Sequence, residues 1–321
     1  MTHYKEFESC NLCEWRCGIN RYEEAGVCGA SGVPIVASSI LHPAPPSSYD
    51  AFLAGCNFRC LFCQNFSIST YPKGKYYREF EGYYEPYVWA RKAIDELNSE
   101  QAKWIRADRL FFTGGEPTIF LPWIEDVAKE AKKIKKDIKV NFDTNGFMTL
   151  DSLKRIIKIS TSITFDIKAF SDEVFRQLTG AYVTPVLRNA EYLMKNAEEK
   201  IWEIRVMIIP EIHNNEIEPL ADFIASIEPY VPVNFLAFRP NFVMEECIGA
   251  NLKFMEECMK TAKNTGLKNV KWSGVTGIKG KNIDLKKILK DSGCIQNIGK
   301  CGECENKNDC KIKKYEPSRI T

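Results

Sequence analysis

Short apolar runs alternate with amphipathic segments through the middle of the chain. Runs with the character of β-strands occupy residues 50–54, 110–113, 139–142, 162–167, 202–209 and 233–238. Helical periodicity covers the intervening residues 122–136, 150–159, 185–196 and 216–227. Strands separated by helices indicate right-handed crossovers and a parallel sheet, and therefore an α/β fold. Six such units are too few for an eight-stranded barrel, so the pattern predicts either a partial (β/α)6 barrel or an open doubly wound sheet.

Composition and charge limit the classes of protein to which the chain can belong. The 321 residues are 45% hydrophobic and 27% charged, which is ordinary for a globular chain, and the net charge is +2. The nearly equal numbers of basic and acidic residues give no strong indication that the protein binds nucleic acid. No apolar run reaches about 18 residues, and the first ten residues lack the apolar stretch of a signal peptide. We therefore expect a soluble, cytoplasmic protein with no membrane partner.

The cysteine content is unusual for such a protein. Thirteen cysteines cannot all pair, and a cytoplasmic chain is an unlikely place for a disulfide framework. Eleven of them fall in three clusters, namely Cys10, Cys13, Cys17 and Cys28; Cys56, Cys60 and Cys63; and Cys294, Cys301, Cys304 and Cys310. Clustered thiols in a reducing compartment indicate metal or cofactor ligands. Cys247 and Cys258 stand alone and are interpreted as small core residues.

Polar residues gather where the predicted strands end. Cys56 follows the first strand, residues 114–117 follow the second, and residues 143–146 follow the third. Asp166 and Lys168 end the fourth strand, and Arg205 lies on the fifth. Because the carboxyl ends of parallel strands meet at one edge of the sheet, these residues predict a site there.

The central cysteines have the spacing C-x3-C-x2-C. Three thiolates on one short loop can hold three irons of a [4Fe–4S] cube and leave the fourth iron open. A closed zinc site would need a fourth ligand. The loop therefore favours a cluster with one vacant position.

This motif resembles the cluster-binding loop of the radical S-adenosylmethionine (SAM) superfamily. Phe62 stands where that family carries an aromatic residue near the adenine, and residues 113–117 resemble its Gly-Gly-Glu-Pro strand end. Within the superfamily, residues 49–240 look most like the pyruvate formate-lyase activating enzyme group. The stretches that carry this likeness are 55–65, 143–147, 166–168, 175–180 and 205–210. The N-terminal stretch at residues 10–29 resembles the cysteine-rich leader of one branch of activating-enzyme homologues.

The resemblance implies a fold, cofactors and roles for individual residues. The fold is a partial (β/α)6 TIM-type barrel, and SAM binds the open iron held by Cys56, Cys60 and Cys63. One electron, supplied by a donor such as ferredoxin or flavodoxin, cleaves SAM to a 5′-deoxyadenosyl radical that removes hydrogen from a substrate. The remaining cofactor-binding positions that the resemblance implies are Phe62, Gly114, Gly115, Glu116, Asp143, Thr144, Asn145, Asp166, Lys168 and Arg205.

Within that set, Glu116 faces the SAM ammonium, a charge-assisted contact. Asp143, Thr144 and Asp166 correspond to ligands of a monovalent cation. Lys168 and Arg205 either neutralise the SAM carboxylate, as catalytic residues beside the three cysteines, or form structural ion pairs.

The terminal cysteines predict further metal centres. We expect a cysteine-rich leader at residues 1–34, the barrel at 49–245, a helical and strand extension at 246–290 and a cysteine-rich auxiliary segment at 291–321. Each terminal quartet offers enough thiolates for a [4Fe–4S] cube or a tetrahedral zinc. The run from Cys301 to Cys310 resembles part of the SPASM or Twitch segments of peptide-modifying radical SAM enzymes.

Three hypotheses for the function follow. The favoured one is a radical SAM enzyme that acts on a polypeptide, by placing a glycyl radical or by modifying a side chain. The second is action on a small metabolite or an RNA base. The third is an iron–sulfur electron-transfer or zinc-binding interaction protein that does not cleave SAM, and the intact Gly114–Pro117 strand end argues against it.

Overall fold

The computed structural model describes residues 1–69, 80–292, 294 and 304. By their internal contacts these divide into two compact units. Unit 1 comprises Met1–Asn57 and Ser67–Ile163, and unit 2 comprises Phe58–Phe66 with the residues from Thr164 onward. Eight strands follow one another in the sheet in chain order, from β1 to β8. A doubly wound sheet would reverse its strand order at a switch point, so this order excludes the doubly wound alternative and confirms the barrel-type α/β fold.

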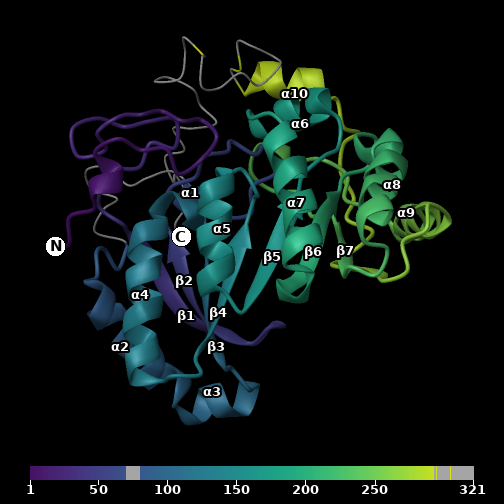
Figure 1. The fold of residues 1–321 in the computed structure, drawn as a ribbon. Helices are drawn as coiled ribbons and strands as arrows, with labels where there is room; N and C mark the ends of the chain where they lie inside the picture. Colours follow the sequence, from purple (N-terminus) through teal and green to yellow (C-terminus); the bar gives the residue numbers. More distant parts are fainter. Residues whose placement is uncertain (70–79, 293, 295–303, 305–321) are drawn as a thin grey trace. The chain divides into compact units, whose positions relative to one another are not determined.

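From β2 onward, one or more helices separate each strand from the next (Figure 1). The strands are β1 (Val36–His42), β2 (Ser48–Leu53), β3 (Arg109–Gly114), β4 (Lys139–Thr144), β5 (Ser162–Ile167), β6 (Ile201–Ile208), β7 (Val233–Ala237) and β8 (Val270–Ser273). The helices are α1 (Phe66–Ser69), α2 (Pro86–Leu97), α3 (Glu100–Ile105), α4 (Leu121–Ile134), α5 (Leu150–Ile159), α6 (Asp172–Thr179), α7 (Thr184–Asn196), α8 (Ile217–Ile227), α9 (Leu252–Asn264) and α10 (Leu285–Asp291). Single 3₁₀ turns are η1 (Lys5–Phe7), η3 (Pro117–Phe120), η4 (Glu198–Lys200), η5 (His213–Asn215) and η6 (Phe242–Met244).

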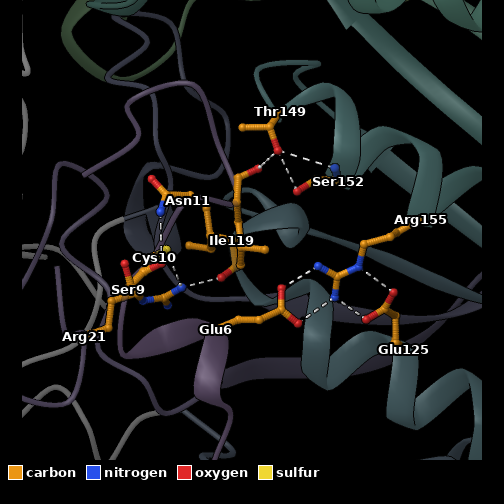
Figure 2. Close-up of polar contacts among 11 residues, drawn as sticks. Glu6, Ser9, Cys10, Asn11, Arg21, Ile119, Glu125, Thr149, Ser152 and Arg155 are labelled. Carbon is orange, nitrogen blue, oxygen red and sulfur yellow. Dashed lines mark hydrogen bonds and ion pairs between the residues drawn. The ribbon is translucent and has the colours of Figure 1, made fainter. Parts of the chain in front are cut away.

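In unit 1, β1 pairs antiparallel with β2, and β2, β3 and β4 pair in parallel. Helices α2 and α4 pack against each other, and α4 also contacts α5. Thr149 caps the start of α5, where its hydroxyl accepts from the Ser152 amide and also donates to the Leu12 carbonyl of the leader (Figure 2). The first helix after the β4 loop is thus fixed to the N-terminal segment.

In unit 2, the parallel pairing continues from β6 to β7 and from β7 to β8. Helix α9 packs on α8 and on the last two strands. Helix α6 begins at a Ser171 cap and ends at Gly180, whose φ of +76° is the left-handed conformation that suits glycine at a helix C-terminus.

The six expected strands are confirmed to within two residues at each end, and the sheet contains two more, β1 and β8. Strand β1 precedes the first expected strand, and the proline-rich stretch at 43–46 forms the turn between β1 and β2. The extension after residue 246 contributes β8, a four-residue strand of which only Val270 is buried. Within the described residues, no helix combines the length and apolar character needed to cross a membrane.

The core of unit 1 is built around an aromatic cluster. The Trp89 ring of α2 is fully buried and lies 5.9 Å from Tyr49, 5.5 Å from Phe112 and 6.0 Å from Trp123, measured between ring centroids. Such offset and edge-on packing adds to the stabilisation from burial. The cluster therefore ties helices α2 and α4 to strands β2 and β3.

We predict that Trp89→Ala lowers the free energy of unfolding by about 3–5 kcal/mol, because it leaves a cavity where four rings meet. Trp104→Ala on α3 is the matched control, since that side chain is 83% exposed and its loss should change stability by less than about 0.5 kcal/mol. Urea unfolding followed by circular dichroism measures both. Equal midpoints for the two variants would contradict this account of the core.

Candidate active site

The end of strand β3 is pressed against the end of strand β2. The Gly115 amide donates to the Leu53 carbonyl at 2.8 Å, and the Glu116 amide donates to the Gly55 carbonyl at 2.9 Å. A Cβ atom on Gly115 would lie 2.0 Å from the Gly55 oxygen, and one on Gly114, which has a φ of +115°, would lie 2.3 Å from the Leu53 nitrogen. Both positions therefore require glycine, and the contact holds Glu116 beside the residue that precedes Cys56.

Glu116 is a buried carboxylate that is surrounded by neutral donors. One of its oxygens accepts from the Thr144 hydroxyl at 2.8 Å and from the Thr118 amide at 3.1 Å, and the other accepts from the Asn145 amide at 2.8 Å. Burial raises its pKa to about 7, although these hydrogen bonds act in the opposite direction. Among the described residues no cationic side chain contacts Glu116, so a cation brought by a ligand would stabilise its charged form.

A buried amide pair links this carboxylate to the first cysteine of the cluster loop. The Asn145 side chain donates from Nδ2 to Asn57 Oδ1 at 2.7 Å and lies 3.9 Å from Cys56 Sγ. Asn57 is fully buried, and its Nδ2 has no hydrogen-bond partner within the described part of the chain. A buried N–H group without a partner is costly, and beside Cys56 it suits an anionic group such as a cluster sulfide or a ligand carboxylate.

The second half of the cysteine loop is anchored within unit 2. The Arg59 amide donates to the Thr179 carbonyl at 2.7 Å, and the Leu61 amide donates to the Leu178 carbonyl at 3.0 Å. The C-terminal end of α6 therefore fixes the stretch that carries Cys60 and Cys63, whose side chains are half-buried. Phe62 between them is buried.

The polar residues at the next strand ends form two separate groups. In unit 1, the Thr113 hydroxyl donates to Asp143 Oδ2 at 2.9 Å. In unit 2, Asp166 forms ion pairs with Lys168 Nζ at 2.6 Å and with Arg205 Nε at 2.8 Å. Burial opposes the charge on Asp166, but Arg205 and Lys168 outweigh it and hold the Asp166 pKa below its usual range.

Lys168 is also held through its backbone. His213 accepts from the Ile209 amide at Nδ1, and its Nε2 donates to the Lys168 carbonyl at 2.9 Å. Burial lowers the pKa of His213, which is consistent with this neutral tautomer. This histidine joins the loop after β6 to the end of β5 and serves to position Lys168.

These residues fit the cofactors that the sequence resemblance implies. The loop offers three thiols, Asn57 offers an unpartnered donor, and Glu116 offers an anion for an ammonium group. No group of three or more His, Cys, Asp or Glu side chains within the described ranges is already placed as a metal site. Since metal–thiolate bonds supply the energy that draws such ligands together, the fit rests on the donor chemistry rather than on a preformed cage.

Comparison with known proteins decides the family. The profile of the radical SAM superfamily matches residues 51–224, which is more than half of the 321 residues. The chain belongs to the radical SAM superfamily. It is accordingly a radical SAM enzyme, a class that uses a [4Fe–4S] cluster and SAM and takes electrons from a donor.

Relatives within the superfamily are distant. An uncharacterized protein of Methanocaldococcus jannaschii is 26% identical over 268 residues, which cover 80% of this chain and 73% of that protein. The pyruvate formate-lyase 1-activating enzyme of Escherichia coli K12 is 24% identical over 173 residues, covering 52% of this chain and 63% of that enzyme. The structure of Streptococcus suis SuiB bound to S-adenosylmethionine has a TM-score of 0.50 at 15% identity, over 68% of this chain and 48% of SuiB. This last similarity shows a shared fold.

Sequence reasoning missed Asn57 and the anchors of the cysteine loop. Asn57 stands directly after the first cysteine, but nothing in the sequence shows that its amide meets Asn145. The C-terminal quartet is a different case, because Cys301, Cys310 and most of the segment resembling SPASM or Twitch lie outside the described residues. Cys294 and Cys304 are half-buried.

We predict that SAM binding to the cluster-loaded, unreduced enzyme weakens as the pH falls through 7. With its pKa raised to about 7, Glu116 loses the charge that attracts the SAM ammonium, so affinity falls up to about tenfold per pH unit below that value and levels off above it. Glu116→Gln should bind SAM weakly and lose this dependence. Equilibrium dialysis between about pH 6 and about pH 8 measures both.

Asp50→Asn is the control for that experiment. Burial also raises the pKa of Asp50, on β2, to about 7, so it titrates in the same range without contacting Glu116. This variant should keep the pH dependence. The role of Glu116 is wrong if the dependence survives in Glu116→Gln.

Proposed function

We propose that this radical SAM enzyme acts on a polypeptide, from which it removes a hydrogen atom to place a glycyl radical or to modify a side chain. The observation that carries the proposal is the alignment with pyruvate formate-lyase activating enzymes, which by name act on another protein. The strand-end residues that carry the resemblance to that group support the proposal, since Gly114 to Glu116 lie at the end of β3 and Asp143 to Asn145 at the end of β4.

The residues of this chain have separate tasks in this function. Cys56, Cys60 and Cys63 would hold the cluster, which when bound passes one donor electron to SAM, so that the C5′–S bond breaks to give methionine and a 5′-deoxyadenosyl radical that takes the substrate hydrogen. Glu116 would bind the SAM ammonium in a site from which water is excluded, because its carboxylate is only 1% exposed. Asn57 would donate its free N–H to the anionic side of the same site.

The other strand-end residues would position the SAM carboxylate. By the same resemblance, Asp143, Thr144 and Asp166 supply oxygen ligands for a monovalent cation, and Lys168 and Arg205 face the carboxylate. The ion pairs with Asp166 support a charged state for both, since the Asp166 charge outweighs burial and raises the pKa of Lys168. A permanent positive charge is what a carboxylate-binding role requires.

A second candidate is action on a small molecule. The GTP 3′,8-cyclase of Crocosphaera subtropica is 22% identical over 189 residues, which cover 58% of this chain and 52% of that enzyme, and its name states a nucleotide substrate. The alignments with activating enzymes cover similar lengths at slightly higher identity, so we favour the polypeptide.

An extract of the organism that encodes the chain separates the two candidates. The reconstituted, reduced enzyme is given either the macromolecular or the low-molecular-mass fraction, and 5′-deoxyadenosine is measured. We predict that only the macromolecular fraction raises the turnover, by about tenfold or more over the basal rate, and that protease treatment removes the effect while nuclease does not. Deuterium from a labelled protein fraction should appear in 5′-deoxyadenosine. If the low-molecular-mass fraction raises the turnover and protease treatment does not remove the effect, a small-molecule substrate is favoured instead.

A further inference from the structure

Backbone turns of the leader gather its four cysteines within unit 1. The Cys10 amide donates to the Ile19 carbonyl and the Gly18 amide donates to the Cys10 carbonyl, both at 3.0 Å, which closes a loop that carries Cys13 and Cys17. A Cβ atom on Gly26 would lie 3.0 Å from Cys17 Sγ, so the turn that leads to Cys28 rests on this thiol. The leader thus holds the loop of Cys10, Cys13 and Cys17 against the turn that leads to Cys28.

The electrostatics of the thiols agree with this placement. Cys28, Cys10 and Cys17 each lie within electrostatic range of the buried Cys13 thiol. Cys13 and Cys28 are buried, and Cys10 and Cys17 are half-buried. Four thiols in mutual electrostatic contact are a donor set for a tetrathiolate metal centre.

Within the described part of the chain, a buried arginine beside Cys10 has no anionic partner. Arg21 is 2% exposed and donates to the carbonyls of Ala30, Ser31 and Ile119, at 3.3, 2.7 and 2.5 Å. Its Nη1 also lies 3.8 Å from Cys10 Sγ, and no carboxylate among the described residues contacts it. A guanidinium keeps its charge in a protein, and burying such a charge without a counter-charge is strongly unfavourable.

Figure 2 shows the contrast with a second arginine of the same unit. Arg155, which is more exposed, forms ion pairs with both Glu6 and Glu125. Among the described residues, the polar atoms of Arg21 contact carbonyl oxygens and the Cys10 sulfur. The Phe7 and Phe120 rings lie 4.3 Å and 4.9 Å from its guanidinium carbon. Of these described contacts, the Cys10 sulfur is the one that can carry a negative charge.

We propose that Cys10, Cys13, Cys17 and Cys28 bind a metal as a tetrathiolate centre, and that Arg21 balances its negative charge. Four thiolates around Zn²⁺ or around a [4Fe–4S]²⁺ cube carry a net charge of about −2. The four thiols give up their protons to solvent on binding, and no electron is transferred. No three of these thiols are already placed as a metal site in the described structure, so binding draws the sulfurs inward.

This centre would lie next to the candidate active site within unit 1. Cys13 forms a backbone bridge with Met148, and the Trp15 indole donates to the Asn57 carbonyl at 2.8 Å. The Glu14 amide donates to the Phe147 carbonyl at 3.1 Å. Metal binding by the leader would therefore order the segment that lies against Asn57 and the loop after β4.

Metal analysis of the full-length chain tests the proposal independently of the proposed function. The starting variant, Cys56→Ala/Cys60→Ala/Cys63→Ala, removes the central cluster and is purified anaerobically. Adding Cys13→Ala/Cys17→Ala should remove about one zinc, or about four irons with four sulfides, per chain. Adding Cys247→Ala/Cys258→Ala, two buried cysteines outside the clusters, is the matched control and should remove none. Equal metal content in the two variants would overturn the proposal.

Alkylation of the unaltered protein gives a test that depends on no variant. Iodoacetamide labelling with mass spectrometry should show Cys10, Cys13, Cys17 and Cys28 protected together, and a chelator should expose Cys10 and Cys17 at least tenfold faster. Labelling rates that the chelator leaves unchanged would contradict a metal centre.

The charge role of Arg21 has its own readout. Arg21→Gln should release the leader metal to a chelator about tenfold faster than the unaltered chain, whereas Arg21→Lys, which keeps the charge but has fewer donors, should stay closer to it. Equal release from the two variants would show that hydrogen bonding, and not charge, explains the buried guanidinium.

Discussion

The backbone at the end of β3 runs so close to the backbone at the end of β2 that Gly114 and Gly115 have no room for side chains. This contact organises unit 1 around the candidate site. It places the Glu116 amide on the Gly55 carbonyl, and Gly55 is followed by Cys56. The Glu116 carboxylate then reaches Thr144 and Asn145 at the end of β4, so three successive strand ends are joined by short hydrogen bonds.

The N-terminal leader adds further contacts to the loops at these strand ends. Trp15 contacts Asn57, Thr149 contacts Leu12, and Arg21 reaches the carbonyl of Ile119 in the turn that follows Glu116. The N-terminal cysteines are therefore folded onto the loops that carry the site. A metal centre there would stabilise the same loops, because binding energy spent on ordering the leader also orders what it touches.

Much of this could be predicted from the sequence, and the remainder depends on contacts that no local pattern records. Strands β3 and β4 are mostly buried and carry apolar residues at 110–112, 140 and 142, so their pattern was clear. Strand β1 was not predicted, because it has two serines and half-exposed positions. It also pairs with β2 in an antiparallel hairpin whose turn is rich in proline, which is not the pattern of a buried parallel strand. The cysteine spacing and the Gly-Gly-Glu-Pro strand end indicated the family. The pairing of Asn57 with Asn145, and the burial of Arg21 without a carboxylate among its described contacts, depend on segments that are distant in the sequence.

Reductive cleavage of SAM is the most direct test of the assignment as a radical SAM enzyme. The anaerobically reconstituted and reduced chain should form 5′-deoxyadenosine and methionine from SAM in equal amounts, and Cys56→Ala, Cys60→Ala or Cys63→Ala should each abolish this activity. A chain that carries its central cluster and binds SAM, yet yields no 5′-deoxyadenosine under reduction, would contradict the account.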